Sequence, residues 1–319
     1  MKAIIPFTQV WYKNCFYHAL FTIVSMYDRE YKIFLQNDFY KYNYNRENFE
    51  LDYVEIATRD VAEDLKEIGI GVTTERPVND IIFILINYLQ QGKLLIVNID
   101  KNVLQNENYN EDIACHSIMV YGYDEEKKCF NILENRYVNS SLFEVGELEE
   151  DKLQIAYSSF VEALTHYKYG IYIFEEMQLE KGAVIDCKAC MRNYIMQNAS
   201  IRKNSLEVFR QFVEDVQHNI TNKEELELHL DHLMKICNQV IVGKKIEIFS
   251  FQTILGADAE GINDIFSRIL EKWKFIRTCF FQYQMRRRYR EETITKIIQS
   301  LCDIEKVEWE AIRYIEDSL

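Results

Sequence analysis

The chain has 319 residues, a net charge of −14, nearly half apolar residues, 2 prolines and 10 glycines. This length holds one large or two ordinary domains, and the scarcity of proline and glycine argues against long disordered linkers. The acidic balance disfavours a general nucleic-acid binder, because the neutralisation of phosphates requires a basic face.

Signals for export or membrane insertion are weak along the sequence. Residues 1–9 turn polar too soon for a signal peptide, and no run approaches the roughly 18 apolar residues of a membrane span. The 8 cysteines are scattered, and without an export signal they are typical of reduced thiols. We therefore expect a cytoplasmic protein that binds neither membrane nor nucleic acid.

Residues 1–176 mix helical and strand patterns. A charged turn separates the apolar runs 117–123 and 129–133, which predicts a β-hairpin. Apolar periodicity, capping residues and compact apolar runs mark the other elements. The predicted helices begin at Cys15 and cover 60–68, 79–91 and 158–164, and the predicted strands cover 94–99 and 170–174.

From about residue 190 the pattern is almost wholly helical. Apolar residues recur every three or four positions over roughly 205–220, 223–241, 262–290 and 292–317. The sequence therefore predicts an α+β fold, with a catalytic domain over 1–176 and a helical C-terminal subdomain over 177–319. The aromatic-rich run 39–45 follows neither a helix nor a strand period, so we predict a loop there.

Cys15 is the candidate nucleophile. It follows Asn14, whose side chain suits a helix N-cap, so the thiol is expected in the first helical turn. The helix dipole and the unpaired amides of that turn stabilise a thiolate, the nucleophilic form of cysteine. Gln9 stands six residues earlier. A loop of that length can place its side-chain amide beside the Cys15 backbone amide, so that the two flank one oxyanion.

His116 is the candidate general base, because it opens the first strand of the predicted hairpin. If the turn centres on Glu126, Glu134 lies diagonal to His116 on the same face and can orient its ring. A slip of one residue would put Asn135 on that face instead. A lone cysteine in an apolar helix or a lone histidine at a strand start is usually a packing residue. The combination at this spacing favours a catalytic pair.

Three short motifs carry a resemblance to a known family. They are Gln9-x5-Cys15, His116-x3-Val120-x-Gly122-Tyr123-Asp124 and Phe130-x-Ile132-x-Glu134. Their order resembles the plan of papain-like cysteine enzymes. Asn14-Cys15 at the head of an apolar helix, together with the segment 115–124, more closely resembles the N-terminal domain of butirosin biosynthesis protein H. That family joins such a domain to a helical C-terminal region, and the resemblance by motif covers about residues 5–176.

The resemblance implies a cysteine acyltransferase of antibiotic or other specialised-metabolite biosynthesis. An acyl group would pass from a thioester on an acyl or peptidyl carrier protein, through Cys15, to a small-molecule amine. No metal or bound cofactor is required, since the phosphopantetheine arm of the carrier protein delivers the acyl group. Phe16 occupies the place where peptidases of this fold usually carry glycine, and Glu134 replaces the usual Asp or Asn. A cysteine hydrolase of the same fold and a catalytically inactive binding module are the alternatives.

Two further clusters stand out in the C-terminal half. Four arginines, Arg286, Arg287, Arg288 and Arg290, lie within five positions of an acidic chain. If they sit on a helix, they form either a solvated helix end or a patch for the acidic carrier protein or its phosphate. Cys187 and Cys190 form a single Cys-x-x-Cys without a second pair, so we expect no zinc or redox role for them.

Overall fold

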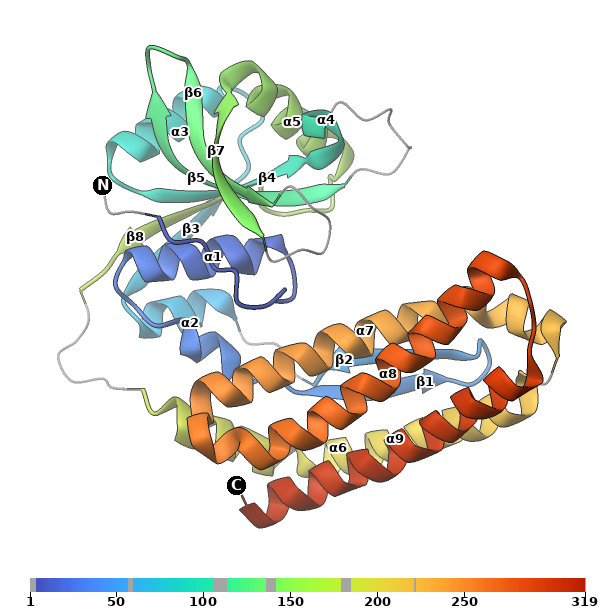
Figure 1. The fold of residues 1–319 in the computed structure, drawn as a ribbon. Coiled ribbons are helices and arrows are strands. Elements are labelled where there is room, and N and C mark those ends of the chain that lie inside the picture. The colour runs from blue at the N-terminus through green and yellow to red at the C-terminus, as the bar shows by residue number, and fades with distance from the viewer. Residues whose placement is uncertain are drawn as a thin grey trace. The chain divides into compact units, whose positions relative to one another are not determined.

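The computed structural model describes residues 4–56, 60–105, 114–135, 142–178, 185–220 and 222–318, and for Gln105 the backbone alone. The chain forms two compact units (Figure 1). The first comprises Met1–Tyr31 and Asp60–Val184, and the second comprises Lys32–Arg59 and Ile185–Leu319. The mixed α+β class and the helical C-terminal part agree with the sequence prediction. Residues Lys32–Arg59 differ from the expected division, because they group with the helices and not with the N-terminal unit.

The first unit is built on a six-stranded antiparallel sheet with the order β3-β8-β4-β5-β6-β7. Its strands are β3 (Ile70–Glu75), β4 (Leu94–Asp100), β5 (Cys115–Asp124), β6 (Cys129–Asn135), β7 (Phe143–Glu149) and β8 (Ile171–Glu176). Its helices are α1 (Cys15–Met26), α2 (Val61–Glu67), α3 (Ile81–Gln90), α4 (Lys101–Gln105) and α5 (Glu150–Ala163). The 3-10 turn η1 (Tyr31–Leu35) that follows α1 begins at the boundary with the second unit.

The central strand β4 is buried along its whole length, because helices cover both faces of the sheet (Figure 1). On one face, Val97 and Ile99 of β4 and Ile118 of β5 pack with Leu153 of α5 and Leu85 of α3. Helix α1 lies against the other face (Figure 1). Alternate residues of β4 and β5 therefore face two different environments.

Most of the predicted elements of this unit are confirmed, including the helix start at Cys15 and the hairpin. The helix predicted from residue 158 begins earlier, at Glu150, because acidic residues in its first turn suit the helix dipole. The hairpin also contains a bulge between Val120 and Gly122 that alternation alone does not predict. Between the bulge and the turn, the pairing of β5 with β6 is shifted by one residue. Before the bulge, toward His116, Val120 still pairs with Ile132.

The second unit is a bundle of long helices that encloses a two-stranded hairpin. Its elements are β1 (Tyr40–Asn45), β2 (Glu50–Glu55), α6 (Cys187–Asn219), α7 (Lys223–Leu255), the 3-10 turn η2 (Gly256–Ala259), α8 (Glu260–Arg286) and α9 (Glu291–Ser318). The prediction of a loop over 39–45 was wrong. The strand does show a period of two, because Tyr40, Tyr42 and Tyr44 alternate with polar residues, and Tyr40 and Tyr42 are buried against the helices.

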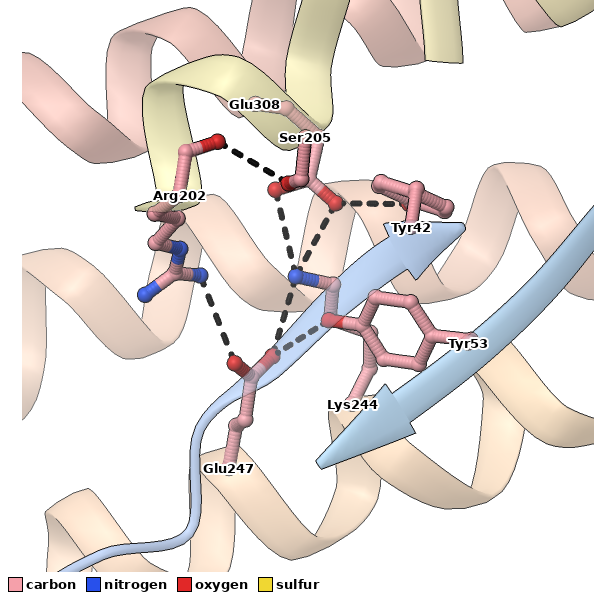
Figure 2. Close-up of polar contacts among 7 residues, drawn as sticks. All are labelled: Tyr42, Tyr53, Arg202, Ser205, Lys244, Glu247 and Glu308. Carbon is pink, nitrogen blue, oxygen red and sulfur yellow. Dashed lines mark hydrogen bonds and ion pairs between the residues drawn. The ribbon is translucent and has the colours of Figure 1, made fainter. Parts of the chain in front are cut away.

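A fully buried ion network joins this hairpin to the helices (Figure 2). Lys244 Nζ lies 2.9 Å from the carboxylates of both Glu247 and Glu308. Tyr42 donates a hydrogen bond to Glu308 at 2.8 Å, and Tyr53 donates one to Glu247 at 3.0 Å. Burial and the neighbouring carboxylates raise the pKa of both tyrosines well above the usual value, so their hydroxyls stay protonated donors.

Arg202 completes the charge balance of the network. Its Nη2 lies 3.3 Å from Glu247, so two cations, Arg202 and Lys244, match the two carboxylates. Its Nη1 is buried and has no hydrogen-bond partner among the described residues. The hairpin is therefore held in the bundle by polar contacts that exist only in the assembled unit.

Among the residues that the structure describes, no helix is long and apolar enough to cross a bilayer.

Candidate active site

The first helix presents Cys15 at its N-terminus. The Asn14 side chain accepts a hydrogen bond from the Tyr17 amide at 3.4 Å and caps the helix, as predicted. Capping fixes the point at which the helix begins, so the Cys15 thiol stands in the first turn. The residue is partly buried.

A long-range contact fixes the position of the sulfur. The backbone amide of Ser117 in β5 donates a hydrogen bond to Cys15 Sγ at 3.1 Å. The Ser117 nitrogen is two covalent bonds from His116 Cα, so Sγ lies within about 6 Å of that atom. The tertiary structure thus brings the predicted nucleophile to the backbone of the predicted base, although the two residues are far apart in the sequence.

The His116 side chain, however, belongs to the other face of the sheet. His116 pairs with Ile99 across β4 and β5, and Ile99 packs on the α5 side. Its neighbour Ser117 pairs with Asn98 and donates to Asn98 Oδ1 at 2.7 Å. Because successive side chains of a strand alternate, the His116 ring lies on the face away from α1.

The His116 imidazole is buried, and its Nε2 has no hydrogen-bond partner among the described residues. Burial and, to a smaller extent, the nearby Lys101 ammonium lower the pKa of His116 to about 3. The ring is therefore neutral at physiological pH. Lys101 itself donates to the backbone oxygen of Asn135 at 3.1 Å. An orphaned buried nitrogen requires an explanation, and a catalytic role is one of the recognised ones.

The hairpin register separates the two candidates for the third residue. Val120 pairs with Ile132 on the side of the bulge nearer to His116, as the predicted turn centre requires. Glu134 pairs with Glu144, and Asn135 pairs with Phe143. Phe143 stacks on an α1 side chain, so Asn135 shares the α1 face with the Cys15 helix. Glu134 consequently lies on the same face as His116.

The loop that carries Gln9 is anchored at both ends by one histidine of α1. His18 Nδ1 donates to the Phe7 carbonyl at 3.2 Å, and the Tyr12 amide donates to His18 Nε2 at 2.9 Å. Burial lowers the pKa of His18 to about 4, so the ring stays neutral, with Nδ1 as a donor and Nε2 as an acceptor. The Tyr31 hydroxyl donates to Gln9 Oε1 at 3.0 Å. This bond engages the amide oxygen of Gln9 and not the amide nitrogen that the predicted oxyanion contact requires.

Two neighbours of the thiol were not predicted from the sequence. Cys115 and Tyr167 interact with each other and with the Cys15 sulfur electrostatically. Burial raises the pKa of the Cys115 thiol to about 11, so this sulfur stays protonated beside Cys15. The only sequence signal for Cys115 is its position in the strand, two residues before Ser117. Strand alternation puts the two side chains on the same face.

The remaining candidates lie in the helical unit. Helix α8 ends at Arg286, and Arg287, Arg288 and Arg290 follow in the turn before α9. The predicted helix over 262–290 therefore ends four residues early, and these three arginines do not lie on it. Cys187 begins α6 and Cys190 is exposed. Across the described ranges of the chain, no group of three or more His, Cys, Asp or Glu side chains is arranged to hold a metal ion.

None of the models of known protein families matches the chain, and no curated protein matches it at a significant level.

Proposed function

We propose that the N-terminal unit is a cysteine acyltransferase with Cys15 as its nucleophile. The observation that carries the proposal is the hydrogen bond from the Ser117 amide to Cys15 Sγ at the capped N-terminus of α1. A partly accessible thiol at a helix N-terminus, with a backbone donor aimed at the sulfur, suits a nucleophile better than a packing residue does. The buried, unpartnered Nε2 of His116, next along the chain, is the second supporting feature.

The proposed reaction has two halves. The Cys15 thiolate attacks the carbonyl carbon of a thioester, the donor thiolate leaves, and the acyl group is held on Sγ. An amine then attacks this acyl-enzyme, His116 takes the proton of the amine, and the Cys15 thiolate is released. The tetrahedral oxyanion of each half is received by the Gln9 side-chain amide and the Cys15 backbone amide.

The proposal requires the β5 backbone to shift at His116. In the structure its ring lies on the α5 face, whereas Cys15 lies beside the strand backbone. A change of rotamer alone leaves the ring on that face, because the backbone fixes the direction of Cβ. Since Sγ is within about 6 Å of His116 Cα, a local turn of the strand at its first residues would bring Nε2 toward the sulfur. Substrate binding would then favour the conformation in which the neutral ring accepts a proton. Glu134 is proposed to orient the ring, and Asn135 is the alternative.

The proposed donor is an acyl or peptidyl carrier protein whose phosphopantetheine arm carries the thioester, and the proposed acceptor is a small-molecule amine. This assignment rests on the resemblance of residues 5–176 to butirosin biosynthesis protein H. A cysteine helix packed on an antiparallel sheet is compatible with a papain-like arrangement, and no bound cofactor takes part in the proposed steps. Reactions of this kind belong to specialised-metabolite biosynthesis in the cytoplasm.

The test is the intact mass of the protein after incubation with acyl-loaded carrier protein or a small free acyl thioester. We expect one acyl adduct on the native chain and none on Cys15→Ala. Cys190→Ala is the matched control, because Cys190 is an exposed thiol of the helical unit. An adduct that persists in Cys15→Ala, or no adduct with any donor, would refute the assignment of the nucleophile.

A second measurement separates the alternatives. An amine acceptor should discharge the acyl-enzyme faster than water does, and His116→Ala should slow that discharge. Discharge by water alone would identify a hydrolase. A chain that forms no adduct and still binds the donor would identify an inactive binding module.

A further inference from the structure

The turn between α8 and α9 borders a small open pocket in the helical unit. The pocket lies where the C-terminal end of α8 meets the N-terminal ends of α7 and α9. The residues that line it are Leu226, Cys279, Phe280, Gln282, Tyr283, Arg286, Arg288, Arg290, Thr293, Ile294 and Ile297. Three of them are arginines and none is acidic, although the chain as a whole carries a net charge of −14.

The turn geometry brings these arginines together. The α8 helix closes with a hydrogen bond of 2.7 Å from the Arg287 amide to the Tyr283 carbonyl. Arg287 then adopts a left-handed conformation with φ of 50°, which ends the helix and reverses the chain direction. Arg288 and Arg290 are thereby directed to the same pocket as Arg286. On a continuous helix Arg286 and Arg290 would share a face, and Arg288 would point to the opposite side.

The three lining arginines differ from the fourth in their partners. Arg287 does not line the pocket, and its Nη1 lies 4.0 Å from Glu227. Arg286 and Arg288 form no ion pair with a carboxylate in the described part of the chain, and Arg290 interacts electrostatically with the exposed carboxylate of Glu292. Three guanidinium groups that face one pocket repel one another, and an anion between them would relieve this repulsion.

The floor of the pocket is apolar. Phe280, Ile294 and Leu226 are buried side chains that line it beside the arginines. A small inorganic anion would contact the guanidinium groups and leave this apolar surface uncovered. A ligand with an anionic head and a short organic part matches both halves of the pocket.

We infer that this pocket binds the phosphate of a small organic phosphate ester. Planar guanidinium groups donate paired hydrogen bonds to phosphate oxygens. Three guanidinium groups match the charge of a dianionic phosphate better than that of a ligand with a single carboxylate. The inference rests on residues of the helical unit alone and does not depend on the chemistry proposed for Cys15.

Cys279 provides a local reporter of occupancy. It lines the pocket and is partly buried, and this burial raises the pKa of its thiol. A ligand in the pocket should slow the alkylation of Cys279 by iodoacetamide. Cys302, a partly buried thiol of α9 that does not line the pocket, is the internal control.

The experiment measures binding to the full chain by isothermal titration calorimetry at low salt, with 4′-phosphopantetheine, inorganic phosphate and pantetheine as probes. We expect 4′-phosphopantetheine to bind more tightly than inorganic phosphate, and pantetheine, which lacks the phosphate, not to bind. The affinity should fall as salt rises. Alkylation of Cys279 should slow in the presence of 4′-phosphopantetheine, with Cys302 unaffected.

The arginine variants locate the site. Arg288→Gln should weaken binding by about tenfold or more, because it removes a charge-assisted pair of hydrogen bonds. Arg287→Gln is the matched control, since it changes the neighbouring arginine that does not line the pocket, and its affinity should equal that of the native chain. Equal losses in both variants would overturn the site, as would the absence of binding by all three probes. Equal affinity for inorganic phosphate and 4′-phosphopantetheine would overturn the assignment of an ester.

Discussion

Replacement of Lys244 by Met should destabilise the helical unit strongly. Lys244 is fully buried, and its ammonium group lies 2.9 Å from both Glu247 and Glu308. In the variant, Glu247 keeps Arg202 and a tyrosine hydroxyl as partners. Glu308 keeps only the hydrogen bond from Tyr42 among the contacts that define the network. The variant therefore leaves a carboxylate buried without a cation.

The magnitude follows from this uncompensated charge. Removal of one partner of a buried ion pair typically costs about 3–5 kcal/mol of unfolding free energy, because the other charge remains away from water. The methionine side chain fills nearly the same volume as lysine, so a cavity contributes little to the loss. We expect a loss of about 3–5 kcal/mol for Lys244→Met. The double variant Lys244→Met/Glu308→Gln should lose less than the single variant, because it removes both charges.

Urea unfolding followed by the far-UV circular dichroism of the helices measures the effect. Lys296→Met is the control, because Lys296 pairs with Glu292 on an exposed helical surface and should change stability little. A Lys244→Met variant as stable as the native chain would refute the reasoning. A double variant less stable than the single one would also refute it, because the loss would then come from packing and not from charge.

Two further predictions concern pH and packing. Burial lowers the pKa of His116 to about 3 and that of His18 to about 4, below the ordinary value of 6.5. Between pH 6.5 and 4 the unfolded chain therefore binds protons that the folded chain does not, so stability should fall with falling pH by about 1.4 kcal/mol per pH unit for each histidine. Gly243→Ala should destabilise the helical unit by about 1–3 kcal/mol, because its Cβ would lie 2.7 Å from the Tyr53 ring.

Each of these has its own control. In a series of urea unfolding curves across this pH range, His116→Leu should reduce the change of unfolding free energy with pH by the part due to His116. An unchanged pH dependence would contradict a buried neutral imidazole. For the packing prediction, Gly146→Ala is the matched variant, since nothing lies within 4 Å of the added Cβ. Similar stabilities of Gly243→Ala and Gly146→Ala would mean that the Tyr53 ring can move aside at no cost.

Local signals in the sequence determined much of the secondary structure. Asn14, as an N-cap residue, predicted where α1 begins, and apolar alternation around a charged turn predicted the β5–β6 hairpin. Both signals act between residues close in the chain, through hydrogen bonds and faces that form before any packing. For the same reason they located Cys15 in the first turn of its helix.

Only the tertiary structure decided which groups meet. The contact of Cys15 with the Ser117 amide joins α1 to β5, and the face of the His116 ring depends on which side of the sheet α1 covers. The strand β1 lies in the helical unit, and Lys244 is fully buried although a lysine in a helix normally predicts a solvated face. In each case the deciding interaction involves partners distant in sequence, whose free energy depends on burial and desolvation that no local pattern records.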